Sequence, residues 1–172
     1  MKKIIFSLLS VVLVLASCGD SAKDVHKAIV SQFEEVANKM KIISQDISGD
    51  NYDGAKASID SLLVKVNEAE KVISSLSNRK AEAYKISALE YLVYVKENAA
   101  PVFGKAIDMF KAAKVRESED VAKGKQSPTL INSGPDFDAA RKVVKDFMKE
   151  LKKSQEVVIE KEEKFLKNNN IQ

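Results

Sequence analysis

The spacing of apolar residues is the sequence feature that most constrains this fold. Four stretches of the chain repeat apolar side chains in steps of three and four residues. That period places the apolar side chains on one stripe of an α-helix and leaves most charged side chains outside it. No stretch shows the strict apolar–polar alternation of a half-buried strand. The pattern therefore predicts an all-α fold built from amphipathic helices.

The first two stretches predict helices over about 23–48 and 52–76. A short polar turn, Ser48-Gly49-Asp50-Asn51, separates them and supplies a glycine suited to a helix C-terminus. Asn51 or Asp53 can cap the start of the second helix. Because the connection is so short, the two helices should form an antiparallel hairpin.

The third stretch predicts a helix from about residue 79 to about residue 115 that contains a proline. Its apolar stripe shifts phase between Val95 and Val102, and Pro101 lies beside the shift. Proline lacks a backbone N–H group and clashes with the carbonyl four residues earlier. We therefore expect this helix to be kinked or broken near Asn98–Pro101.

Residues 116–135 differ in character and predict a long loop. They begin with charged and polar residues, and Gly124, Pro128 and Gly134 interrupt regular structure. The only apolar cluster in this segment is Thr129–Ile131. Loops of this length in a compact domain are usually functional or disordered.

The fourth helix should begin near Asp136, with Pro135 at or before its first turn, and end at Asn168–Asn170. Four amphipathic helices in sequence predict an antiparallel up-down-up-down four-helix bundle, with the third helix kinked or broken near Pro101.

The first 18 residues predict the cellular location of the rest of the chain. Lys2 and Lys3 precede an apolar run, Ile4–Leu15, and small residues follow it. This order is typical of an export signal, and the run is shorter than the roughly 20 residues of a spanning helix. The ending Leu15-Ala16-Ser17-Cys18 resembles the bacterial lipobox, which implies that Cys18 becomes a lipidated N-terminus. We expect 1–17 to be a cleaved signal peptide, 18–24 an acylated cysteine with a tether, and 25–172 a single helical domain.

Cysteine content and charge narrow the classes of protein further. Cys18 is the only cysteine, so an exported form has no disulfide available, and acylation would account for the lone thiol. The formal net charge is +3, and Lys2 and Lys3 would leave with the signal peptide. Since lysine and glutamate are interleaved in the near-neutral remainder, we expect no basic stripe and no nucleic-acid partner.

No group of residues in the sequence predicts a catalytic, metal or cofactor site. His26 is the only histidine, so the paired Glu-x-x-His motifs of a bundle di-metal site cannot form, and His26 should be an ordinary residue at a bundle end. Neither a Gly-x-Ser-x-Gly motif nor a phosphate-binding glycine loop occurs. We expect three methionines to fill the core and three tyrosines to form a partly buried aromatic layer. These residues are Met40, Met109 and Met148, and Tyr84, Tyr91 and Tyr94. We expect the charged run 160–164 to form a solvated helix face. We therefore expect a protein that is not an enzyme and has no cofactor.

Two short motifs bear on modification and sorting. Asp20-Ser21-Ala22 and Asp60-Ser61-Leu62 are similar to a three-residue O-glycosylation sequon, which leaves glycosylation of Ser21 and Ser61 open. Gly19 after Cys18 does not match the aspartate signal for inner-membrane retention, so the outer membrane is favoured.

The chain as a whole resembles a family of uncharacterised bacterial surface lipoproteins, which are small helical proteins of Bacteroidetes and spirochaetes. The resemblance rests on the segments Val25–Val30, Asp50–Tyr52 and Phe165–Ile171. It implies a lipid-anchored envelope protein, and it supplies no catalytic residues to carry over. The proline-containing segment 124–135 departs from the family.

Two functions remain open from the sequence. The first is a non-enzymatic binding module on the outer membrane or cell surface. Its partners would be the membrane, through the lipid anchor, and a protein or envelope component held by an outer helix face or by residues 116–135. The alternative is a carrier of a small apolar ligand or lipid, with a cavity opened near Pro101. The sequence does not decide between a periplasmic and an outward-facing position, nor the oligomeric state.

Overall fold

The computed structural model describes residues 19–124 and 132–171. Within these ranges the chain forms four long α-helices and one 3-10 helix, and no described residue lies in a strand. The α-helices are α2 (Ala22–Ser48), α3 (Tyr52–Ser75), α4 (Glu82–Ala122) and α5 (Pro135–Asn168), and the 3-10 helix η1 (Arg79–Ala81) precedes α4. The predicted all-α four-helix bundle is confirmed.

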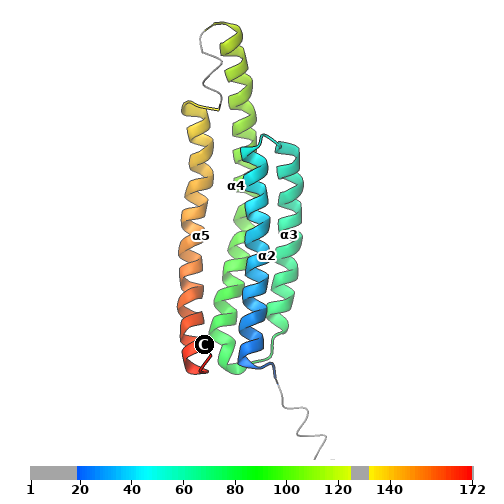
Figure 1. The fold of residues 1–172 in the computed structure, drawn as a ribbon, viewed down its shortest axis with the longest axis vertical. Coiled ribbons are helices and arrows are strands. Elements are labelled where there is room, and N and C mark those ends of the chain that lie inside the picture. Colours follow the sequence, from blue (N-terminus) through cyan, green and yellow to red (C-terminus); the bar gives the residue numbers. More distant parts are fainter. Residues whose placement is uncertain (1–18, 125–131, 172) are drawn as a thin grey trace, which may run out of the picture.

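The four helices lie lengthwise beside one another (Figure 1). We call the end at which α2 begins and α5 ends the proximal end, and the end at which α2 passes into α3 the distal end. In Figure 1, α2 and α4 run from the proximal toward the distal end, and α3 and α5 run back. α4 packs against both α3 and α5, whereas α2 packs mainly against α3. α4 is therefore the central helix of the bundle.

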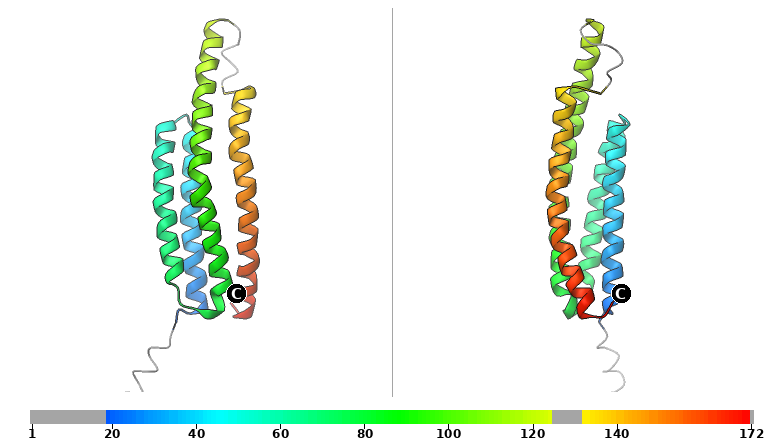
Figure 2. Two further views of the ribbon diagram at one scale, coloured as in Figure 1. Left: turned by 180° about the vertical axis from the view of Figure 1, so that it is seen from behind. Right: turned by 60° about the vertical axis from the view of Figure 1, so that its left-hand side comes forward.

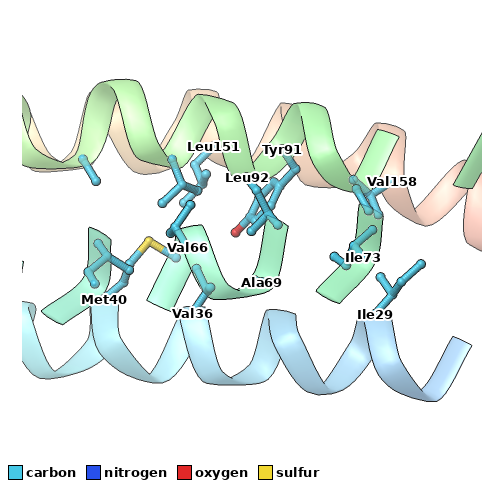
Figure 3. Close-up of a cluster of buried hydrophobic side chains, with 14 of the residues drawn as sticks. Ile29, Val36, Met40, Val66, Ala69, Ile73, Tyr91, Leu92, Leu151 and Val158 are labelled. Carbon is cyan, nitrogen blue, oxygen red and sulfur yellow. The ribbon is translucent and has the colours of Figure 1, made fainter. Parts of the chain in front are cut away.

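The apolar stripes meet in one core, to which all four α-helices contribute (Figure 3). From α2 the core takes Val25, Ile29, Val36, Met40, Ile43 and Ile47, and Phe33 is half-buried with its ring centroid 4.8 Å from that of Tyr91. Full burial of each large apolar side chain contributes roughly 1.5–3 kcal/mol. Tyr84 and Tyr91 are buried and Tyr94 is half-buried against Phe147, which confirms the aromatic layer.

The methionines do not all fill the core as the sequence interpretation expected. Met40 is buried, Met109 is half-buried, and Met148 is exposed. The expectation for Met148 is wrong because it follows Phe147, which takes the inward position of that helical turn.

The predicted helix boundaries agree closely with the structure where a cap or a turn residue marks them. Ser21 caps α2 by accepting a hydrogen bond from the Asp24 backbone N–H at 3.2 Å. Asn51 caps α3 by accepting one from the Gly54 N–H, also at 3.2 Å, so Asn51 and not Asp53 is the cap. Pro135 stands in the first turn of α5, where its missing N–H leaves no helical bond unmade.

α4 continues through Pro101 as a single helix of 41 residues. At 1.5 Å per residue its length is about 60 Å. Pro101 is exposed, while Ala99 and Phe103 on either side of it are fully buried. The chain is thus not broken at Pro101, since packing on both sides keeps α4 helical. A kink at this position stays a prediction.

The loop predicted over residues 116–135 begins too early. α4 extends through residues 116–122, and its distal turns reach beyond the α2–α3 turn (Figure 2). The charged residues there favour a solvated helix, with Lys123 Nζ lying 3.4 Å from Glu119 Oε2, one turn earlier. The helix ends instead at Ala122, two residues before Gly124, whose φ of 68° suits a glycine. Thr129–Ile131 lie outside the described residues.

Contacts at the proximal end hold the residues before α2 against the connection between α3 and η1. Asp20 accepts a hydrogen bond from the Ser77 N–H at 2.6 Å, and the Asp20 carbonyl accepts one from Asn78 Nδ2 at 2.9 Å. His26 Nε2 lies 2.7 Å from Glu162 Oε1, which joins α2 to α5 at the same end. His26 is therefore a bundle-end residue, as the sequence predicts.

Candidate interaction site at the distal end

The distal end brings together three segments that are far apart in the sequence. These are the α2–α3 turn, the second half of α4 and the start of α5 (Figure 1). The described parts of the predicted segment 116–135, which are residues 116–124 and 132–135, therefore lie at the end of the bundle opposite Asp20. This end is the candidate site.

The α2–α3 turn holds Asp50 in a fixed position. Gly49 N–H donates to the Gln45 carbonyl at 2.9 Å and ends α2, and Asn51 Nδ2 donates to Asp46 Oδ1 at 2.9 Å. Asp50 itself has a φ of 62°, in the left-handed region that aspartate tolerates better than most residues. The turn thereby directs the Asp50 carboxylate toward α4.

Asp50 joins the turn to α4 and to the first residue of α3. Its carboxylate accepts a hydrogen bond from Lys114 Nζ and one from Tyr52 Oη, the second at 2.9 Å. The bond from Lys114 lowers the pKa of Asp50, against the opposing effect of burial. Burial, together with the bond to the Asp50 carboxylate, raises the pKa of Tyr52 to about 12. At neutral pH the Asp50 carboxyl group is therefore ionised and the Tyr52 phenol is neutral.

The start of α5 is tied to α4 by a second polar cluster. Arg141 Nη2 donates to the Asn132 carbonyl at 2.6 Å, and the Asn132 N–H donates to Glu117 Oε1 at 3.0 Å. Arg116 Nε lies 3.0 Å from Asp136 Oδ2. These contacts hold the two described ends of the α4–α5 connection on the distal turns of α4.

A small hollow lies between the two clusters. Its volume is about 190 Å³, and it is lined by Ile47, Ser48, Asp50, Phe110, Asn132, Phe137 and Arg141. Three of these side chains are apolar, and the Phe110 and Phe137 rings lie 6.2 Å apart. The buried Asn132 Oδ1 accepts no hydrogen bond from the described residues. The hollow thus combines three apolar side chains with the polar and charged residues Asp50, Asn132 and Arg141, which suits one amphipathic side chain of a partner.

The other residues singled out by the sequence lie elsewhere. Cys18 is outside the described residues. Ser21 is exposed at the cap of α2, where its Oγ donates to Asp24 Oδ2 at 2.6 Å, and Ser61 is half-buried on α3. No group of three or more histidine, cysteine or acidic side chains suited to a metal ion occurs in the described ranges. No described helix has the length and hydropathy needed to cross a membrane.

Comparisons with protein-family models, with curated proteins and with solved structures found no match to this chain. The class of protein is therefore defined by the fold alone, an all-α four-helix bundle. The resemblance to surface lipoproteins stays a prediction.

The backbone at Asp50 leads to a stability prediction. Asp50→Ala should lower the free energy of unfolding by about 1–2 kcal/mol, because alanine is strained at a positive φ and the contacts to Lys114 and Tyr52 are lost. Asp50→Asn is the matched control, since asparagine tolerates this φ and can still accept from Tyr52. Urea denaturation at neutral pH measures both. Equal losses in the two variants would contradict the backbone argument.

The charge of Asp50 adds a pH dependence to the same comparison. A carboxylate whose pKa is lowered by folding stabilises the protein above its unfolded pKa of about 3.9, and the contribution is lost as pH falls through the folded value. The difference between the wild-type protein and Asp50→Asn should therefore shrink below about pH 4.

Proposed function

We propose that the protein is a lipid-anchored envelope protein, held by Cys18, whose distal end is a non-enzymatic interaction site. The observation that carries the proposal is the separation of the two ends. Asp20 is bound to Ser77 and Asn78 at the proximal end, whereas the hollow and its polar clusters lie at the distal end. A lipid on Cys18 would leave the distal end as the part of the bundle farthest from the attachment.

The length of α4 supports this arrangement. A helix of 41 residues, about 60 Å long, is longer than the hydrocarbon thickness of a bilayer. A bundle standing upright on its anchor would carry the site well beyond the lipid headgroups. Three acyl chains, as the lipobox resemblance implies, exceed the two signals that stable anchoring typically needs.

Cell fractionation of the wild-type protein and of Cys18→Ala tests the anchor. The wild-type protein should sediment with membranes, and the Cys18→Ala protein should move almost entirely to the soluble fraction, because no other described segment can hold it in a bilayer. Lys23→Ala, at an exposed position outside the Leu15–Cys18 segment, is the control. Membrane association of Cys18→Ala would overturn the anchor.

Protease treatment of intact cells then locates the distal end. Cleavage of the wild-type protein while a periplasmic control protein survives would place the site on the cell surface. Cleavage only after the outer membrane is opened would place it in the periplasm. Either result directs the search for a partner to one compartment.

A carrier of an apolar ligand is the weaker proposal. The interior beside Pro101 is filled, since Ala99, Phe103 and Ala106 have no exposed surface. A wider hollow of about 550 Å³ lies along the distal half of α4, but four of its six lining residues are charged. These residues are Lys105, Asp108, Arg116 and Asp136. Such a surface suits a polar partner better than a lipid chain.

A further inference from the structure

The proximal end of the bundle carries basic side chains that the described protein does not pair. The three segments that form this end, 19–28, 74–85 and 162–171, hold seven lysine and arginine residues and five acidic residues. Of the seven, only Lys85 lies within ion-pair distance of a described acidic side chain, with its Nζ 3.9 Å from Glu82 Oε2. The six others are all exposed, and they are Lys23, Lys27, Arg79, Lys80, Lys164 and Lys167.

Most of the acidic side chains at this end have partners other than lysine or arginine. A backbone N–H group binds one carboxylate at 2.6 Å, a serine hydroxyl binds another at 2.6 Å, and an imidazole nitrogen lies 2.7 Å from a third. Only Glu163 has no described partner. The three contacts are Ser77 to Asp20, Ser21 to Asp24, and His26 to Glu162.

The distal end is arranged in the opposite way. Its segments 46–53, 111–124 and 132–141 hold five basic and eight acidic residues, so acidic side chains are in excess. Each of the five basic residues is in an ion pair. The pairs are Lys111–Asp53, Lys114–Asp50, Arg116–Asp136, Lys123–Glu119 and Arg141–Asp138. The bundle is therefore positive at its proximal end and negative at its distal end (Figure 1).

A polar hollow of about 450 Å³ lies at the proximal end between the start of α2, the α3–η1 connection and the end of α5. Two of the free cations, Arg79 and Lys80, line it together with amide and hydroxyl side chains. Guanidinium and ammonium groups are the side chains that phosphate oxygens bind most strongly. The complete lining is Gly19, Asp20, Ala22, Ser77, Asn78, Arg79, Lys80 and Asn169.

The chain is bound to the bundle from Gly19 onward. A Cβ at Gly19 would overlap the backbone carbonyl oxygen of Ser77, so only glycine fits this close approach. Asp20 is held by Ser77 and by Asn78, and α2 begins at Ala22. Because consecutive Cα atoms are about 3.8 Å apart, a lipid on the preceding residue would be attached one peptide unit from the hollow.

We propose that the proximal end binds the phosphate groups of anionic phospholipids, with Arg79 and Lys80 as the contacting side chains. The proposal rests on the proposed lipid on Cys18, which would bring this end to the layer of lipid headgroups. The other four unpaired lysines add positive charge at the same end. The negative distal end is repelled by an anionic surface, so the charges favour a bundle that stands upright on its anchor.

Vesicle sedimentation tests the contact on a chain that begins at Gly19. This chain contains every residue of the core and lacks Cys18, so failure of the headgroup contact and failure of the anchor are distinguishable. In low salt it should bind vesicles of equal parts phosphatidylglycerol and phosphatidylcholine, and it should not bind pure phosphatidylcholine. Binding should be lost at about 1 M salt, where the Debye length falls to about 3 Å. A wash at this salt concentration removes the same contribution from cell fractionation, which keeps the test of Cys18 separate.

Two double variants make the test specific. Each lysine or arginine at an anionic membrane surface strengthens binding about fivefold, so Arg79→Ala with Lys80→Ala should weaken it about 30-fold. Both residues are exposed and lack a side-chain partner among the described residues, so the variant should unfold at the same temperature as the wild-type chain. Lys142→Ala with Lys145→Ala, on exposed positions in the distal half of α5, removes the same charge and should change binding by less than about twofold.

Four results would overturn the proposal. The chain could fail to bind the phosphatidylglycerol vesicles, or it could bind pure phosphatidylcholine equally well. The two double variants could lose binding to the same extent, which would show that total charge and not the proximal end decides. Millimolar inorganic phosphate at constant ionic strength could displace the chain from the vesicles, which would identify the free anion as the ligand of the hollow.

Discussion

Pro101→Ala is expected to raise the free energy of unfolding by about 1–3 kcal/mol. Pro101 lies deep inside α4, where it removes one helical hydrogen bond and crowds the carbonyl of Glu97. The residue is exposed, so its replacement removes no core contact. Alanine restores the N–H donor and has the highest helix propensity. Urea denaturation of the two proteins, with the m-value compared, gives the change directly.

Gly104→Ala is the matched control in the same helix. A Cβ added at Gly104 meets no atom within 4 Å, so this change tests helix propensity alone and should stabilise by about 1 kcal/mol. If Pro101→Ala destabilises while Gly104→Ala stabilises, the proline has a packing role. In that case a bend at Pro101 is needed for α4 to follow its neighbours, and the predicted kink gains support.

The sequence predicts a kink or a break near Pro101, and the structure has no break there. The rule that proline interrupts a helix considers one residue and its own turn. The tertiary structure adds Ala99 and Phe103, which are buried on either side of Pro101 and hold the chain in the core. Buried contacts of this kind outweigh a local cost of a few kcal/mol. The apolar stripes predicted the helices well because those stripes are the surfaces that pack.

The distal site was only partly predictable. Ser48–Asn51 marked the turn, but nothing in the local sequence pairs Asp50 with Lys114, because that contact depends on how α2 and α4 lie beside each other. The extent of α4 was missed for a different reason. The charged residues after Val115 predict a loop, whereas they form a solvated helix up to Ala122, two residues before the positive-φ Gly124.

Phe103→Ala should have the largest effect on stability, a loss of about 3–5 kcal/mol. Phe103 has no exposed surface, and its ring packs edge-on against that of Phe147 at 5.7 Å between centroids. Truncation to alanine removes the transfer free energy of the ring and leaves a cavity in the centre of the bundle. Urea denaturation measures the loss. Val115→Ala, at a position 59% exposed on the same helix, is the control and should change stability by less than about 0.5 kcal/mol.

If Phe103→Ala does not fold, Phe103→Leu keeps most of the volume and should lose about 1.5 kcal/mol or less. A loss below about 1 kcal/mol for Phe103→Ala itself would contradict the packing of this region.

The same variant separates the two proposed functions. An apolar cavity in a folded core stays dry and can take up a small apolar molecule. Benzene should therefore stabilise Phe103→Ala against heat in a concentration-dependent way, as any ligand specific to the folded state does. The wild-type protein, whose interior beside Pro101 is filled, should show no such shift. An equal shift in the wild-type protein would reveal an interior site and favour the carrier, because a bundle that serves only through its outer surfaces needs no space inside.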